Sequence, residues 1–151
     1  MHLTLNDTYL VYEAGNPVPK IINYTQADLD EIAAAVAEAS SPAALKARAA
    51  TRRYAREIGG IEAAGIVIDT SRESQAMIAG AHAYVQATPA ATVEFKAASG
   101  WVTLDAATVT TIALAVASHV QACFAAEKAA DEAIDAGTIT TAAEVDAAIA
   151  A

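Results

Sequence analysis

GWVTLDAATV, residues 100–109, runs from a strand-like stretch into a long helical pattern with almost no connector. Asp105 is a residue type that favours the N-cap of a helix, so we predict that the strand ends and the helix begins within about one residue. Trp101, the only tryptophan, follows a turn directly. We predict that it is a buried structural anchor that fixes the angle between hairpin and helix, and that Trp101→Ala costs about 3–5 kcal/mol.

The helix that begins after Asp105 is expected to reach about Asp135, with Gly137 as its stop. Residues 106–126 carry no formal charge, and a segment of that length could span a bilayer. Polar residues interrupt the segment, however, and its apolar residues fall on one helical stripe: Val109, Ile112, Val116, Val120, Cys123 and Phe124. We therefore predict a buried amphipathic helix and no membrane span.

Two short hairpins are predicted upstream of this helix. TVEF (residues 92–95) and WVTL (residues 101–104) form one of them, with residues 97–100 as the turn. GGIEAAGIVIDT (residues 59–70) forms the other, with its turn near Ala64 and Gly65. Between the hairpins, Thr70 and Glu73 predict a capping box for a helix that reaches about Ala87.

The remaining elements complete an α+β fold of about five helices, two short antiparallel β-hairpins and a small N-terminal β segment. The first helix follows Thr25 and Asp28 and carries an apolar stripe of Leu29, Ile32 and Val36. The second begins at Pro42 and ends near Ile58, and Thr141 with Glu144 caps the last. We divide the chain into an attachment module (residues 1–40), an α+β domain (41–136) and a C-terminal capping helix (137–151).

Composition limits the function classes. Alanine makes up roughly half of the 55% hydrophobic residues, so the core is thin and help from partner subunits is expected. A net charge of −9 argues against nucleic-acid binding. Arg48, Arg52 and Arg56 nevertheless share one helical face, which is either an anion-binding stripe or a solvated face paired with carboxylates. We favour the carboxylate pairing.

No constellation in the sequence predicts catalysis. His119 and Cys123 are spaced to share a metal ion, but only His2 and His82 remain as further histidines, and neither belongs to a companion motif. The sequence contains neither a phosphate-binding glycine motif nor a nucleophile elbow. The start, MHLTLND, has neither a basic region nor an apolar run, so no signal peptide is expected. We predict a non-enzyme without a cofactor or a metal.

Four segments carry a resemblance to known proteins: EIGGI, IDTSRESQAMI, WVTLDAATV and HVQACF, in this order. They resemble a family of uncharacterised bacteriophage and prophage proteins, a domain of unknown function whose members are similar to products of tail and tail-fibre gene regions. The resemblance covers roughly half of the chain. Family members usually carry a Gly-Ala-Asp-Gly type of turn before the tryptophan, where this chain has Ala-Ala-Ser-Gly, so the shape of that turn is expected to differ.

The resemblance implies a phage tail, baseplate or tail fibre that is assembled in the host cytoplasm, and it brings no catalytic residues. One hypothesis is a structural or adaptor subunit of the virion, in a homo-oligomer or another symmetric assembly with other tail proteins. The alternative is a tail-fibre assembly chaperone.

The N-terminal β segment lies outside the resemblance and is the expected attachment site. Alternation along the predicted strands places apolar side chains on both faces, so one face needs a second layer. The interface candidates are Tyr9, Leu10, Val11, Tyr12, Ile21, Ile22 and Tyr24. We expect this segment to dock on another tail protein or a symmetry mate; the alternative is that it wraps the helical body of its own chain.

Overall fold

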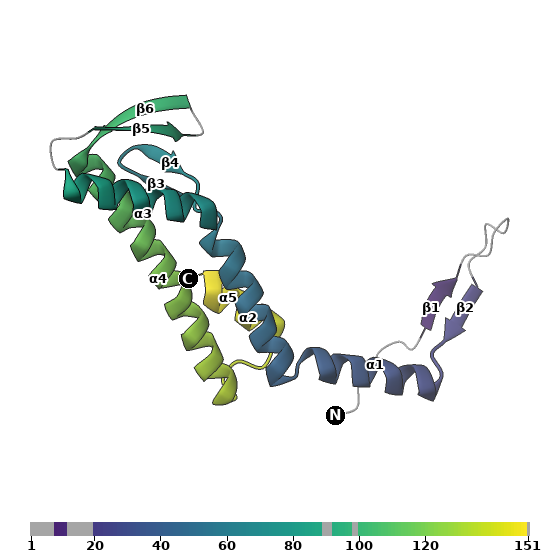
Figure 1. Ribbon diagram of the computed structural model, residues 1–151. Helices are drawn as coiled ribbons and strands as arrows, with labels where there is room; N and C mark the ends of the chain where they lie inside the picture. Colours follow the sequence, from purple (N-terminus) through teal and green to yellow (C-terminus); the bar gives the residue numbers. More distant parts are fainter. Residues whose placement is uncertain (1–7, 12–19, 89–91, 98–99, 151) are drawn as a thin grey trace. The chain divides into compact units, whose positions relative to one another are not determined.

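The computed structural model describes residues 8–11, 20–88, 92–97 and 100–150, and these form five helices and three two-stranded antiparallel sheets (Figure 1). The predicted α+β fold is confirmed. The chain divides into two compact units, Met1–Ser41 and Pro42–Ala151. The two units are described separately below.

The first unit contains β1 (Thr8–Val11), β2 (Lys20–Asn23) and α1 (Gln26–Ala39). The two strands are antiparallel, with Tyr9 opposite Ile22. Thr25 caps α1 as predicted: its hydroxyl accepts from the backbone N–H of Asp28, and the Asp28 carboxylate accepts from the backbone N–H of Thr25 at 2.8 Å. The start of the first helix therefore follows from two residues.

The second unit arranges its elements along one long helix. It contains α2 (Pro42–Glu57), β3 (Ile61–Ala63), β4 (Ile66–Ile68), α3 (Arg72–Ala87), β5 (Thr92–Ala97), β6 (Gly100–Asp105), α4 (Ala106–Asp135) and α5 (Ala142–Ala150). Within this unit, both hairpins and α3 lie beside the N-terminal part of α4, and α2 and α5 accompany its C-terminal part (Figure 1).

The two predicted hairpins of this unit are confirmed. Ala64 and Gly65 connect β3 to β4 with φ angles of 52° and 73°, as a type I′ turn requires, and Ile61 pairs with Ile68. In the other hairpin, Phe95 pairs with Val102. The strands bring apolar residues from both hairpins onto one side, where they pack against α3 and α4.

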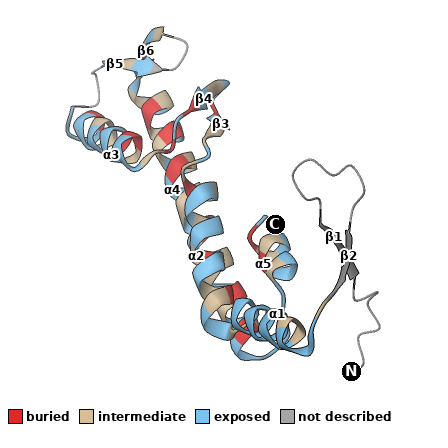
Figure 2. Ribbon diagram, turned by 90° about the vertical axis from the view of Figure 1, so that its right-hand side faces the viewer, coloured by how far each residue is buried: buried red, intermediate tan, exposed pale blue. Residues whose placement is uncertain are grey.

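Among the described residues, most of the buried apolar side chains form two clusters that α4 connects. The first joins the hairpins, α3 and the N-terminal half of α4 through Ala63, Ile68, Ile78, Val85, Leu104, Val109, Ile112 and Val116. The second joins α2, the C-terminal half of α4 and α5 through Leu45, Ala49, Ala130, Ile134, Val145 and Ile149. Figure 2 shows that the buried residues of α4 follow one side of the helix. This is the packing of a core helix.

Both ends of α4 are where the sequence predicts them. Asp105 accepts a hydrogen bond from the backbone N–H of Thr108 at 2.7 Å. Gly137 has a φ of 69° and ends the helix in a Schellman motif, because the N–H of Thr138 bonds to the carbonyl of Ala133 at 2.9 Å. Among the described residues, α4 is the one helix long and apolar enough to cross a membrane. The absence of a membrane span stays a prediction.

Two local expectations were wrong. Ser71, not Thr70, is the N-cap of α3: its hydroxyl accepts from the backbone N–H of Ser74, and Thr70 is fully buried in another role. Phe124, expected on the buried stripe of α4, is 43% exposed because it is displaced by about 100° around the helix from the buried Cys123. The guanidinium of Arg53 lies 4.5 Å from its ring centroid. Val109, Ile112, Val116 and Cys123 of the predicted stripe are buried.

Candidate functional site

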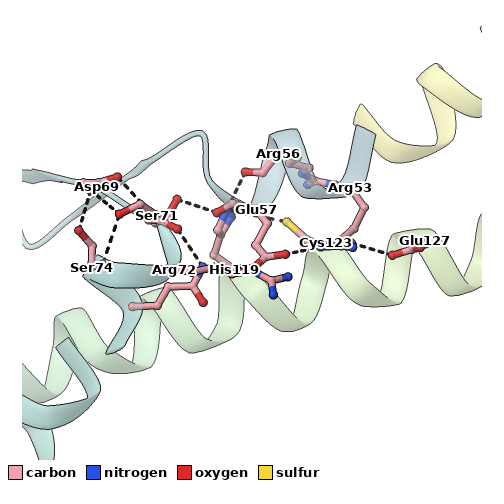
Figure 3. Close-up of polar contacts among 12 residues, drawn as sticks. Arg53, Arg56, Glu57, Asp69, Ser71, Arg72, Ser74, His119, Cys123 and Glu127 are labelled. Atoms are coloured by element: carbon pink, nitrogen blue, oxygen red, sulfur yellow. Dashed lines mark hydrogen bonds and ion pairs between the residues drawn. The ribbon is translucent and has the colours of Figure 1, made fainter. Parts of the chain in front are cut away.

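A buried carboxylate, Glu57, lies at the C-terminal end of α2 and is only 2% exposed. Arg53, one turn earlier, forms an ion pair with it and also donates to Glu127 of α4 at 2.7 Å (Figure 3). From α3, Arg72 and Gln75 each lie 3.3 Å from the other oxygen of Glu57. The carboxylate thus joins α2, α3 and, through Arg53, α4.

The charges of this cluster stabilise each other. Burial raises the pKa of Glu57, but the hydrogen bonds from Gln75 and Arg53 and the positive charges of both arginines outweigh burial, so the pKa lies below its ordinary value. Burial likewise opposes the charge of Arg53, and its two carboxylate partners outweigh that effect and raise its pKa. Both groups are therefore ionised at neutral pH, as a buried pair requires if neither charge is to be left alone.

Thr70 connects the β3–β4 hairpin to the end of α2 through hydrogen bonds. Its buried hydroxyl donates to the backbone carbonyl of Glu57 at 2.6 Å and accepts from the N–H of Gly60 at 2.9 Å. Gly60 has a φ of 84°, and a Cβ there would lie 3.2 Å from the carbonyl oxygen of Ile68. Glycine is therefore required where the chain leaves α2 for β3.

Asp69 organises the entry to α3. Its carboxylate accepts from the hydroxyl of Ser74 at 2.6 Å, and from the backbone and the hydroxyl of Ser71 (Figure 3). The hydrogen bonds from Ser74 and Ser71 hold the pKa of Asp69 below its ordinary value. The Ser71 hydroxyl is also the N-cap of α3. Asp69, Ser71 and Ser74 therefore fix the start of α3 together.

His119 and Cys123 close the other side of the cluster. The Nε2 atom of His119 lies 3.1 Å from the carbonyl oxygen of Arg56 and 3.2 Å from that of Glu57, so the ring caps the last turn of α2. Cys123 is fully buried, 3.8 Å from His119, and burial raises the pKa of its thiol. His119 is therefore a half-buried histidine beside a buried thiol.

The polar groups of this cluster are engaged in contacts that join elements of the second unit. The thiol of Cys123 is kept protonated, which opposes nucleophilic attack and metal binding. In the described part of the chain, no three histidine, cysteine or acidic residues gather where they could hold a metal ion. Sequence reasoning missed Glu57, because its partners on α3 and α4 are distant in the sequence and the nearby glycine pair, Gly59 and Gly60, indicates only the end of the helix.

Two of the three arginines in the basic stripe of α2 pair with a carboxylate, as favoured from the sequence. Arg48 and Arg52 both bind Asp146 of α5, with closest contacts of 2.6 and 2.9 Å. The hydrogen bond from Arg48 is the largest cause that lowers the pKa of Asp146 to about 2. Arg56 instead donates to the backbone carbonyl of Ile149 at 2.7 Å. The stripe thus attaches α5 to α2.

Trp101 is not the buried anchor that the sequence predicts, because it is 71% exposed. In the register of the hairpin it lies opposite Lys96, whose ammonium is 5.8 Å from the indole centroid. The neighbouring Val102 and Leu104 take the side of the strand that packs on α4. Alternation along β6 therefore explains the error: a strand with Leu104 buried must expose the residue three positions earlier.

One of the N-terminal interface candidates, Tyr12, lies outside the described residues. Tyr9, Leu10 and Val11 lie in β1 and pair with Ile22, Ile21 and Lys20 of β2. Tyr24 follows β2, is half-buried and has interaction partners. The role of these residues in attachment stays a prediction.

Two apolar surfaces on helices are also candidates for contacts. In α1 none of the residues is buried, and Ile32 and Val36 of its predicted stripe are 46% and 59% exposed (Figure 2). In the second unit, a groove of about 340 Å³ runs between α3 and α4. Ile78 and Val116 lie in its floor, and Leu114, on its edge, is 62% exposed.

Comparison with known proteins assigns the family. Residues 40–150 match the family model described as Domain of unknown function (DUF4376). The match covers most of the chain, so the chain belongs to this family. No curated protein and no solved structure matches it. The family boundary leaves β1, β2 and α1 outside the shared domain.

Proposed function

We propose, on the premise that the chain belongs to the DUF4376 family, that it is a non-enzymatic structural or adaptor component of a bacteriophage tail, baseplate or tail fibre. It acts through contacts with other tail proteins and with copies of itself. The tail setting is supported by the resemblance of EIGGI, IDTSRESQAMI, WVTLDAATV and HVQACF to phage and prophage proteins. The protein then belongs to the virion and is assembled in the host cytoplasm.

The observation that carries the proposal is the exposed apolar stripe of α1. Ile32 and Val36 lie one turn apart, and the helix that presents them buries no residue. Exposing such a stripe to water is unfavourable, so a helix of this kind is stabilised by a partner that covers it. Because α1 precedes the family match, it is a suitable attachment element for one particular assembly.

The polar groups of the second unit support a role without catalysis. His119 is held by two backbone carbonyls, and Asp69 is held by two serines. Glu57 and Arg53 are ionised and paired. These side chains hold elements together, and using one of them as a base or a nucleophile would break a contact between helices.

The test is to replace the stripe in the phage or prophage that carries the gene. Ile32→Asp/Val36→Asp places two charges on the stripe, whereas Ala34→Asp/Ala37→Asp adds the same charges elsewhere on α1. Quantitative mass spectrometry of purified particles should find wild type and control in a fixed ratio to a known tail protein, with the stripe variant depleted. If wild-type particles lack the protein, the structural role is wrong.

A tail-fibre assembly chaperone is the second candidate, since an exposed apolar stripe also suits transient cover of a fibre segment. Co-expression with the neighbouring fibre gene separates the two roles. If the protein is a chaperone, the co-expressed fibre is soluble and trimeric. The protein itself is then absent from purified particles or present there in less than stoichiometric amounts. A fibre that is soluble and trimeric without this protein would count against the chaperone.

A further inference from the structure

The surface of α3 and α4 is unusually poor in charge. The chain has 27 charged side chains, the sum of 9 basic and 18 acidic residues, yet residues 74–93 and 106–126 contain none. Large apolar side chains are exposed on these two helices, namely Met77 at 54%, Tyr84 at 53% and Leu114 at 62%. Depletion of charge with enrichment of Met and aromatic residues is the composition of an interface core.

The groove between α3 and α4 has the dimensions of a helix-binding site. Its apolar floor is rimmed by the polar side chains Gln75, His82 and Gln121. On α3 the lining runs from Gln75 to His82 and on α4 from Ala113 to Gln121. These segments of eight and nine residues correspond to about two turns, or roughly 10–12 Å from end to end. The groove can therefore hold two turns of an apolar helix face.

The stripe of α1 matches this groove in length and spacing. Leu29, Ile32 and Val36 are spaced i, i+3 and i+7, the arrangement by which an amphipathic helix anchors in a groove. They extend over seven residues, which again is about 10 Å. The chain thus carries both a groove of two turns and an exposed stripe of two turns.

Charge favours a second copy as the occupant. Copies of a chain with a net charge of −9 repel each other, so they are most easily joined through faces without carboxylates. The groove lining contains no carboxylate, whereas α1 is acidic, so its carboxylates are best accommodated beside a positive charge. The N-terminal half of α1 is acidic, with Asp28, Asp30 and Glu31. Beside the groove, Arg72 lies at the first position of α3, one turn before Gln75. Its side chain is 62% exposed.

We propose that the α3–α4 groove of one copy binds α1 of a second copy, with the acidic end of α1 near Arg72. The proposal deepens the proposed function, on which it rests, by naming a partner of the α1 stripe. The contact joins two different surfaces, so repeated contacts close into a ring or a reciprocal dimer, or continue as a filament.

The full chain and three variants test the contact by light scattering after gel filtration, at concentrations up to the order of 100 µM, where weak dimers are populated. Leu114→Asp blocks the groove, and Ile32→Asp/Val36→Asp disables the stripe. The matched control is Ala122→Asp, an exposed position of α4 that does not line the groove. All three replace exposed side chains, and circular dichroism verifies that each variant is folded.

Wild type and control should self-associate, and each of the other variants should weaken association by at least about tenfold, since an unpaired charge must be buried. Mixing the two defective variants should restore a heterodimer, because one supplies an intact α1 and the other an intact groove. A monomeric wild type, or a defective variant that still associates, would overturn the proposal. So would a mixture that stays monomeric, which would indicate contacts between like surfaces.

The outcome is distinguishable from a failure of the tail role. Particle analysis measures incorporation irrespective of self-association, so a protein that enters particles but is monomeric in solution contradicts only the second-copy contact. If wild type instead binds phosphatidylcholine vesicles and Leu114→Asp does not, the groove is a membrane contact and the proposal is overturned.

Discussion

The helices α1 and α2 are consecutive, of similar length, and contain six alanines each, yet they differ in what they bury. α1 buries no residue, whereas α2 buries Leu45, Ala49 and Glu57. The polar contacts differ in the same way. Gln26 of α1 bonds to Asp30, four positions along, whereas Arg48 of α2 bonds to Asp146, 98 positions along.

The difference shows what fixes an alanine-rich helix in this protein. Alanine favours helix formation in both segments, but it offers little apolar area to hold a helix against a neighbour. In α2, arginines supply the missing attachment by reaching carboxylates of α4 and α5. In α1, carboxylates predominate and no basic residue is present, so the attachment that we propose for it relies on the apolar stripe.

Glu57→Ala should give the largest effect. Removing the carboxylate leaves Arg53 and Arg72 without their shared buried partner, and breaking a buried pair costs about 3–5 kcal/mol. The free energy of unfolding from urea denaturation measures the loss. The matched control on the other helix is Glu38→Ala, an exposed carboxylate of α1, for which we expect a change within about 0.5 kcal/mol. Equal effects would erase the contrast between the helices.

The same enlargement in both helices sharpens the comparison further. Ala49→Leu overfills the second core cluster, where Ala49 is fully buried, and should cost about 1–3 kcal/mol. Ala34→Leu adds the same atoms to an exposed position of α1 and should change the unfolding free energy by no more than about 0.5 kcal/mol. Thermal unfolding of both variants measures the difference, and a tolerated leucine at position 49 would show a loosely packed α2.

Trp101→Ala is now expected to have a small effect. The indole is exposed, and its contact with Lys96 at the surface is worth about 0.5–1 kcal/mol at most. Urea denaturation measures the change, with Leu104→Ala as the buried comparison on the same strand, for which a loss of about 2–5 kcal/mol is expected. A loss of similar size for Trp101 would restore the anchor that the sequence predicted.

The smallest expected effect is the loss of stability in acid that results from protonation of Asp146, which links α5 to α2. The pKa of Asp146 is lowered from 3.8 to about 2 in the folded chain, so the folded state releases this proton more easily than the unfolded state. The stabilisation by Asp146 is therefore complete above pH 4 or so and is lost as the pH falls towards about 2. The Asp146→Asn variant lacks this titrating carboxyl group and should be less stable than wild type at neutral pH. The difference in unfolding free energy between the two proteins should shrink as the pH falls from about 4 to about 2. Urea midpoints that differ equally at neutral and acidic pH would contradict this.

The local part of the fold could be predicted, because caps and turns are decided by neighbouring residues. Thr25 with Asp28, Asp105 and Gly137 fixed helix ends correctly, and Ala64 with Gly65 located a hairpin. The roles of the side chains in the cluster could not be predicted in this way. Glu57 is buried because Gln75 and Arg72 arrive from another helix, and nothing near Glu57 in the sequence signals them.

Two predictions were wrong because each rested on a single residue. One ignored the alternation of side chains along the strand, and the other ignored a neighbouring residue that can take the same role. The position of Trp101 at the hairpin–helix joint predicts burial, although the pattern of β6 places Leu104 inwards. The spacing of Thr70 and Glu73 predicts Thr70 as the cap, although Ser71 caps the helix and Thr70 is buried. In both cases the choice depends on which side the core lies, which is information carried by distant elements.

The junction at Asp105 has a mechanical consequence. One residue ends β6 and caps α4, so no flexible linker separates the hairpin from a helix of 30 residues, about 45 Å long. A load applied at the hairpin is therefore transmitted along the helix axis instead of being absorbed by an extensible loop. In an assembly under tension, the hairpin and α4 would therefore move together as one stiff unit.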